Sequence, residues 1–304
     1  MRRLILCLLI WPALALAAAE PFQDGTAAYE RKDYVRALQL LRPLADQGLS
    51  GAQYRVASMY ANGEGVARDY AEAIRWYRKA ADQGNAAAQS NLGTLYASGN
   101  GVAQNYAEAM KWYRKAAKEG DAYAQSNLGA MYALGMGTAQ DQKQAAAWYR
   151  KAAAQGYAPA QYNLGIMYDK GKGVAQDDKQ AVSWYRKAAL QRLGAAQFSL
   201  GVMYSKGRGT ARDDQQAMSW YQKAAAQGYA PAQFNLGVMY ERGDGVAQDY
   251  AQAHKWFDLA AESAIPSESE TRNLAVKNRD LVAAKMTSAQ IAEAEKMKRE
   301  WKPN

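Results

Sequence analysis

Apolar and small residues recur along most of the chain with the spacing of one helical face. In residues 88–96 they stand at i, i+4, i+7 and i+8, as Ala88, Leu92, Leu95 and Tyr96. Residues 109–117 have the same offsets, with Trp112 beside the apolar stripe. This spacing is typical of amphipathic helices, so the pattern predicts pairs of short helices.

Both helices are repeated with a fixed period. Trp76 and Trp112 lie 36 residues apart, and the same step continues along the chain. The residues in this series are Trp76, Trp112, Trp148, Trp184, Trp220 and Trp256. A fixed period of about 20 to 50 residues indicates a solenoid or related array. We therefore predict an all-α solenoid of tandem helix-turn-helix repeats.

The period divides the chain into four parts. The basic start and the short apolar run that follows it are typical of a signal peptide cleaved near Ala17 or Ala19, and the mature chain should have no transmembrane segment. An atypical, half-length first repeat precedes six full repeats, and the period is lost after them in a pair of C-terminal capping helices. Thr287 and Gln290 form the capping-box pattern that begins the last helix. The four ranges are 1–19, 20–48, 49–264 and 265–304.

Glycines mark the turns of each repeat. Gly120 and its equivalents should end the second helix, because glycine adopts left-handed dihedrals without penalty. Pairs such as Gly99 and Gly101 are interpreted as inter-helix turns, because phosphate-binding loops join a strand to a helix. Arg192 takes the place of the glycine that ends the second helix in one repeat, which predicts a locally altered turn.

The fixed residues resemble those of a known family. They are Ala-Gln-x-x-Leu-Gly-x-x-Tyr (88–96), Gly-Asn-Gly-Val (99–102) and Ala-x-x-Trp-Tyr-x-Lys-Ala-Ala (109–117). From about Leu49 to Ala264 the chain resembles Sel1-like repeat proteins, exported bacterial relatives of tetratricopeptide repeats. The resemblance implies a right-handed α-solenoid that acts as an adaptor or regulator through protein contacts. It implies no substrate.

The sequence offers little catalytic chemistry. Cys7 is the only cysteine and falls in the predicted signal peptide, and the only histidine, His254, occupies a position that other repeats fill with Ile74 or Met110. A common zinc site needs three or four ligands. Some cysteine-rich relatives are associated with β-lactam binding or hydrolysis, but the serine-lysine signature of such enzymes is absent here. We expect no catalytic residue, no metal site and no cofactor.

The chain is basic, with a formal net charge of +9. Predicted export argues against nucleic acid as the partner. A series of lysines on the second helices is either a solvated surface or a basic ridge that contacts anionic envelope polymers. The series is Lys79, Lys115, Lys151, Lys187 and Lys223.

The variable positions of the first helices indicate where a partner binds. In related solenoids the equivalent face lines the concave groove, and in the last three repeats this face becomes aromatic and aliphatic with charged ends. The predicted groove residues are Tyr162, Ile166, Lys170, Phe198, Val202, Lys206, Phe234, Val238 and Arg242, with Asn127, Asn163 and Asn235 one place further on. Aromatic anchors are typical of binding hot spots. Equally, Phe198 and Phe234 could pack against the next unit or the C-terminal helices, and the asparagines could satisfy local backbone groups.

Three functions follow from these patterns. The first is a non-catalytic scaffold that holds a peptide or helix of another envelope or secreted protein in the groove. The second is an accessory role in cell-wall or exopolysaccharide machinery, which would need exposed Tyr and Trp rings on which sugars stack. The third, a β-lactam-directed enzyme, lacks a site. The predicted location is periplasmic or secreted.

Overall fold

The computed structural model describes residues 10 to 303, with side chains from Glu20 onward. Within these residues the chain forms helices and loops without any strand, which confirms the predicted all-α class of tandem repeats. Cys7 lies outside the described residues, and of the rest of the predicted signal peptide only the helical backbone from Ile10 is described. The signal peptide therefore stays a prediction.

The helices follow one another as hairpins in chain order. Their bounds are α1 Ile10–Glu30, α2 Tyr34–Asp46, α3 Ser50–Asn62, α4 Tyr70–Asp82, α5 Ala86–Ser98, α6 Tyr106–Lys118, α7 Ala122–Leu134, α8 Gln142–Ala154, α9 Ala158–Lys170, α10 Asp178–Leu190, α11 Gly194–Lys206, α12 Asp214–Ala225, α13 Ala230–Arg242, α14 Tyr250–Ser263, the 3-10 turn η1 Pro266–Glu268, α15 Ser269–Ala283 and α16 Ser288–Glu300.

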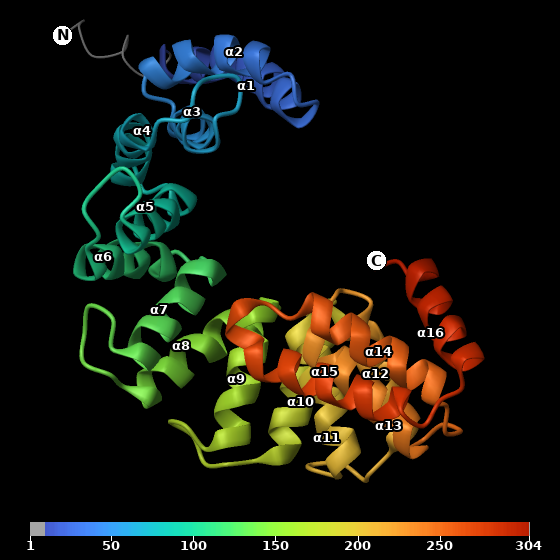
Figure 1. Cartoon of the computed structure of the whole chain (residues 1–304). Coiled ribbons are helices and arrows are strands. Elements are labelled where there is room, and N and C mark those ends of the chain that lie inside the picture. Colours follow the sequence, from blue (N-terminus) through green and yellow to red (C-terminus); the bar gives the residue numbers. More distant parts are fainter. Residues whose placement is uncertain (1–9, 304) are drawn as a thin grey trace, which may run out of the picture. The chain divides into compact units, whose positions relative to one another are not determined.

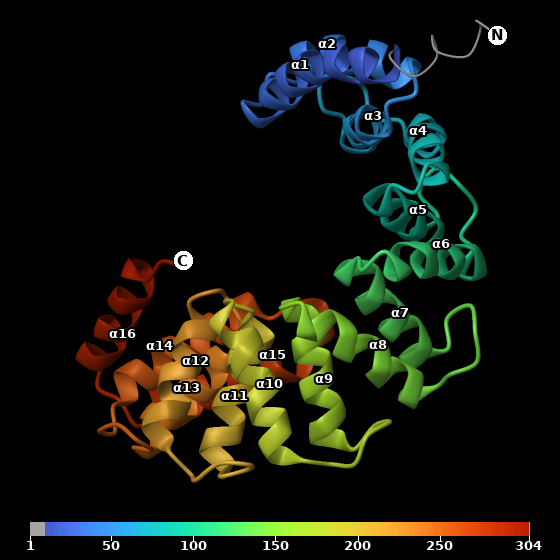
Figure 2. The same cartoon turned by 180° about the vertical axis from the view of Figure 1, so that it is seen from behind.

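The chain divides into two compact units, with the boundary between Trp148 and Tyr149 inside α8. In the first unit the hairpins α1–α2, α3–α4 and α5–α6 stack through contacts of each second helix with the next first helix (Figure 1). In the second unit the hairpins α9–α10, α11–α12 and α13–α14 stack in the same way (Figure 2). The C-terminal helices α15 and α16 pack against α14, and α15 also contacts α13.

Side chains and glycines set the ends of the helices. The Asp213 side chain accepts a hydrogen bond from the backbone N–H of Gln216 at the start of α12, and Asp249 does the same for Gln252 at the start of α14. Gly207 and Gly243 end α11 and α13 with φ values of 63° and 80°. These caps satisfy backbone groups that the helix itself leaves unpaired. The predicted capping box of Thr287 and Gln290 is confirmed.

The turn at Arg192 keeps the geometry of its glycine equivalents. Arg192 has φ 66° and its N–H donates to Ala189 O at 3.0 Å, as Gly84 N–H donates to Ala81 O at 3.0 Å. The predicted local change of the turn is therefore wrong. The hydrogen bonds of the turn hold the arginine in a left-handed conformation that costs a non-glycine residue about 1–2 kcal/mol.

Close approach within and between hairpins depends on glycine. A Cβ at Gly201 would lie 2.6 Å from the Tyr221 ring of the same hairpin. A Cβ at Gly209, in the loop after α11, would lie 2.2 Å from the backbone oxygen of Asp178 in the preceding hairpin. Both distances are shorter than van der Waals contact, so the spacing of neighbouring hairpins is set in part by backbone against backbone.

Candidate functional site: a pocket between α11 and α13

A pocket of about 600 Å³ opens between the C-terminal halves of α11 and α13. This volume suits a ligand side chain or a short segment. We call it the central pocket. Its lining residues are Phe198, Val202, Ser205, Lys206, Arg212, Asp214, Tyr221, Asn235, Val238, Met239, Arg242 and Asp244.

One face of α11 forms the first wall. Phe198, Val202, Ser205 and Lys206 stand at i, i+4, i+7 and i+8, so they project on the same side of the helix. The centre of the Phe198 ring lies 5.8 Å from that of Tyr221. It lies 5.3 Å from that of Tyr229, the residue just before α13. Phe198 therefore lines the pocket and also packs against the next hairpin, and its use as an anchor for a partner stays a prediction.

The floor of the pocket is polar and internally satisfied. The Tyr221 and Ser205 hydroxyls lie 3.3 Å apart. Burial raises the pKa of Tyr221, although hydrogen bonds from Ser205 and Asn235 act in the opposite direction. The phenol is therefore neutral at physiological pH and serves as a hydrogen-bonding group, and Asn235 supports it from α13.

The rim carries charges of both signs. The Arg212 guanidinium donates to the Asp214 carboxylate through Nε and Nη2, with a Nη2–Oδ2 distance of 2.8 Å. Asp244 lies close enough to raise the pKa of Arg212 further, after the larger effect of Asp214. Lys206 and Arg242 are exposed. Among the described residues neither has an acidic partner within ion-pair distance.

The structure gathers half of the predicted groove residues around this pocket. They are Phe198, Val202, Lys206, Asn235, Val238 and Arg242. The Phe234 ring packs against Phe257 at 5.5 Å, and both belong to a hydrophobic cluster with Val282 of α15 and with Met286, which follows α15. Phe234 is thus a packing residue of the last hairpin.

The remaining predicted residues lie on α7 and α9. Tyr162 packs on the Tyr185 ring at 5.8 Å, and Ile166 is half-buried beside it. Lys170 is exposed at the end of α9, 3.4 Å from Asp169. Asn163 is half-buried on the same helix. Asn127 belongs to the other compact unit and donates to the backbone oxygen of Tyr123 at 3.0 Å, a local role.

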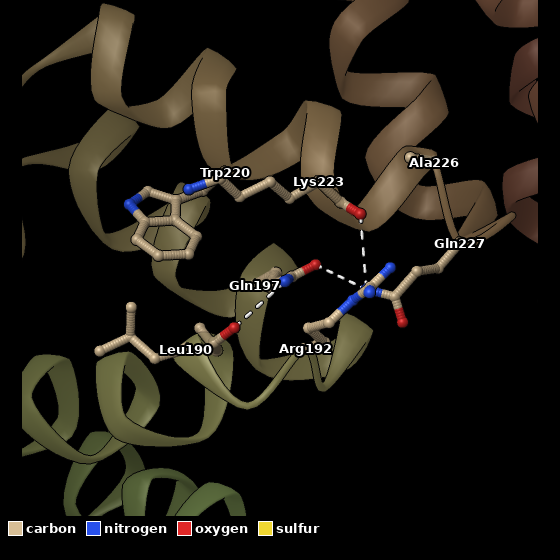
Figure 3. Close-up of a pocket in the computed structure, with 8 residues that line it drawn as sticks. Leu190, Arg192, Gln197, Trp220, Lys223, Ala226 and Gln227 are labelled. Carbon is tan, nitrogen blue, oxygen red and sulfur yellow. Dashed lines mark hydrogen bonds between the residues drawn. The ribbon is translucent and has the colours of Figure 1, made fainter. Parts of the chain in front are cut away.

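A second, smaller pocket of about 290 Å³ lies between the end of α10 and α12. Figure 3 shows the Trp220 ring and Leu190 on its two sides. Beside them, to the right in Figure 3, Gln197 donates to the backbone oxygen of Ala189 at 3.1 Å, and Gln227 donates to Gln197 at 2.8 Å. The repeated glutamines therefore join neighbouring hairpins, and this polar side of the pocket is structural.

The aromatic series are enclosed by the chain's own cations. Lys223 stands over the Trp220 ring at 4.0 Å, and Lys115 over Trp112 at 4.2 Å. In the same way Arg114 donates to the Tyr132 hydroxyl of the next hairpin at 3.1 Å. Trp76, Trp112, Trp220 and Trp256 are buried. Their burial reduces the tryptophan surface on which sugars could stack, whereas most tyrosines of the repeats stay half-buried.

The described residues hold few groups for other chemistry. No set of three or more His, Cys, Asp or Glu side chains in this part of the chain is placed to hold a metal ion. None of the described helices is both long and apolar enough to cross a membrane. His254 is buried in α14 as a packing residue, and burial lowers the pKa of its imidazole.

Sequence patterns missed the polar half of the central pocket. Ser205 and Asp244 replace Asp169 and Arg208 of the preceding repeat, 36 residues earlier, whereas Asp214 matches Asp178. Comparing the loops position by position could have shown this change. Ser205 lies in α11, Asp214 begins α12 and Asp244 lies in a loop, so their convergence on one pocket was visible only in the fold.

Tandem helical hairpins with a variable surface define a repeat-type binding scaffold. The profile of the family described as "Sel1 repeat" matches residues 13–49, 50–85, 86–121, 122–157, 158–192, 194–229 and 230–264. The chain therefore belongs to the Sel1 repeat family. Proteins of this kind generally mediate protein–protein interactions and are generally non-catalytic.

Solved structures agree with this family. A Sel1 repeat protein from Oxalobacter formigenes is 36% identical, with a TM-score of 0.72 over 79% of this chain and 96% of that chain. A protective antigen of uropathogenic Escherichia coli with an SLR fold is 32% identical over 95% of this chain and 77% of that chain, with a TM-score of 0.43. No curated protein matches the chain.

Proposed function

We propose that this protein is a non-catalytic scaffold of the bacterial cell envelope, and that it binds a segment of another envelope or secreted protein across α11 and α13. The observation that carries the proposal is the central pocket. Its walls of Phe198, Val202 and Val238 are only half-buried, and exposed apolar surface ringed by charge is typical of protein-binding sites. The general role of Sel1 repeat proteins supports the same function.

Site-specific photo-crosslinking in the native host tests this proposal. A benzoyl-phenylalanine at position 206, on the pocket rim, should crosslink a discrete protein. The same residue at position 179, on exposed α10, is the matched control and should capture little. The captured protein must then bind the purified chain and lose affinity when Lys206 and Arg242 are both changed to Glu. Equal capture at both positions, or binding that ignores these changes, would overturn the proposal.

Export is a separate part of the proposal, and it rests on the basic and apolar start of the chain. N-terminal sequencing of the protein recovered from the periplasm or medium should give a first residue of Ala18 or Glu20. Recovery of the protein only from the cytoplasm, beginning at Met1, would refute export without affecting the assignment of the pocket.

A further inference from the structure

The central pocket has two equivalents in the same compact unit, one repeat before it and one repeat after it. Each site combines a residue at the end of the first helix of a hairpin with a residue at the start, or near the start, of its second helix. The third residue comes from an element later in the chain. The three sets are Asp169, Asp178 and Arg208, then Ser205, Asp214 and Asp244, then Glu241, Tyr250 and Lys285. Comparing the three sites shows which charged side chains each one contains and which of them are paired within the protein.

In the preceding site a basic side chain of the protein itself fills the space. Arg208 donates through Nε to Asp178 at 3.2 Å and through Nη2 to Asp178 at 2.6 Å, and it also contacts Asp169. Lys170 lies 3.4 Å from Asp169. Asp169 and Asp178 are therefore both paired with basic side chains of the chain itself.

In the following site a basic residue is again supplied from within. Lys285, just beyond α15, donates to Glu241 at 3.3 Å and stands 5.4 Å from the centre of the Tyr250 ring. Glu241 occupies the position that Asp169 holds two repeats earlier. In both flanking sites an acid at the end of the first helix is thus paired with a basic side chain from a later element.

The central pocket departs from both patterns. Ser205 replaces the acid at the end of the helix, and its hydroxyl faces Tyr221. Asp244 stands in the position of Arg208, so the filling cation is missing and the space remains open. Asp214 is already paired with Arg212. Among the residues that the structure describes, Asp244, Lys206 and Arg242 then remain without an ion-pair partner. One acid faces two exposed bases, so the pocket has a surplus of positive charge.

We infer that the central pocket is the anchor site for a carboxylate side chain of the partner segment, which enters between Lys206 and Arg242 while a neighbouring apolar side chain contacts Phe198, Val202 and Val238. This inference rests on the proposed scaffold function and names its ligand chemistry. A basic anchor is disfavoured, because Ser205 replaces one of the two acids that receive Arg208 in the preceding site, and Asp214, the equivalent of the other, is already paired with Arg212. Complementary charge of this kind directs specificity and orientation.

Binding of model peptides tests the inference. The probe is a fluorescein-labelled peptide of alternating Leu and Glu, with twins in which Gln or Lys replaces Glu. The purified chain should bind the Glu peptide at least about tenfold more tightly than either twin, and added salt should weaken that binding. Tighter binding of the Lys twin, or equal binding of all three, would overturn the inference.

Two substitutions assign that binding to the pocket. Ser205→Asp restores the acid of the preceding repeat and should weaken the Glu peptide about tenfold or more, whereas Ser205→Asn, of similar size, should change it little. Adding Asp244→Arg to Ser205→Asp copies the closed site and should abolish binding. If Ser205→Asp impaired folding, seen by circular dichroism, the exposed pair Lys206→Gln and Arg242→Gln would serve instead and should weaken binding. Unchanged affinity in the folded variants would refute the inference.

The outcome is separable from that of the scaffold proposal. Specific crosslinking at position 206 without preference for the Glu peptide would refute the carboxylate anchor and leave the scaffold in place. Preference for the Glu peptide without specific crosslinking at position 206 would refute the scaffold role of this surface.

Discussion

The Asp258 carboxylate accepts a 2.6 Å hydrogen bond from the Lys298 ammonium of α16. Earlier repeats carry Arg78, Arg114, Arg150 or Arg186 at this position, and these arginines donate to a tyrosine of the next hairpin. In the described part of the chain, α14 is followed by η1, α15 and α16 and not by another repeat hairpin. The acid at the same position instead joins the last repeat to the two C-terminal helices, since it also accepts from Arg279 at 2.9 Å.

Loss of this junction should loosen the end of the protein. We expect Asp258→Asn to lower the free energy of unfolding by about 1–3 kcal/mol, because two basic groups lose a charged acceptor. Hydrogen exchange of α16 and thermal unfolding would measure this. Glu262→Gln is the control, since Glu262 is exposed and its pair with Lys298 should contribute about 0–1 kcal/mol. Equal effects of the two changes would contradict the assigned role.

Stability should fall with acid in two steps. Burial lowers the pKa of His254, with the charges of Asp258 and Glu295 opposing and Arg279 adding to that effect. The unfolded chain therefore binds a proton first, and stability decreases as the pH falls through about 6.5. Burial acts to raise the pKa of Asp258, but hydrogen bonds from Lys298 and Arg279 outweigh it and the pKa is lowered. Its contribution is present above about pH 4 and is lost below.

Melting temperatures measured across this range would resolve the two steps. His254→Met introduces the residue found at the equivalent Met110 and Met218 and should remove the upper step only. A pH profile unchanged by this substitution would show that the upper step arises elsewhere.

The glycine of α11 should be intolerant of a methyl group. Gly201→Ala would place Cβ 2.6 Å from the Tyr221 ring, and overpacking of this kind costs about 1–3 kcal/mol. Gly194→Ala is the matched control in the same helix, where the nearest atom is the Gln227 side chain at 3.5 Å. Alanine there should be neutral or slightly stabilising. Chemical denaturation of both variants measures the difference, and a Gly201→Ala protein as stable as the wild type would contradict the packing described.

The turn at Arg192 should gain stability from glycine. Arg192→Gly relieves a left-handed non-glycine residue with φ 66°, and we expect a gain of up to about 1 kcal/mol after the added flexibility of the unfolded chain. Gly228→Ala makes the reverse change at the equivalent turn, with φ 77° and nothing within 4 Å of the new Cβ. It should destabilise by about 1 kcal/mol. Stability changes of the same sign in both variants would contradict this account.

The fold could be predicted because the same pattern of residues recurs in every repeat. Trp112 and its equivalents fix the register, and Gly120 and its equivalents fix the ends of the second helices. The prediction for Arg192 was wrong because it relied on the preference of glycine for left-handed dihedrals. That preference gives the cost of the conformation for another residue, and it does not describe the hydrogen bonds of the turn that hold Arg192 in it. The apolar wall of the central pocket was also within reach, since Phe198, Val202 and Lys206 share a helical face.

The rest of the site depends on contacts that have no periodic signal. The packing of Phe234 in one cluster with Val282 of α15 was one of two alternatives that the sequence left open, because the tail after Ala264 lacks the repeat that would place it. Arg208 closes one site and Asp244 leaves the next one open, yet both occupy loops of the same length and glycine pattern. The two residues hold equivalent positions, so their opposite charges give them opposite effects on the site.

The close backbone contact at Gly209 and Asp178 has a consequence for protein engineering. Because adjacent hairpins are spaced by main-chain atoms at this point, the side chains around each site can be exchanged without altering the pitch of the array. Loop cassettes transplanted from one repeat to another should therefore change which ligand is bound while leaving the position of the binding site along the protein unchanged.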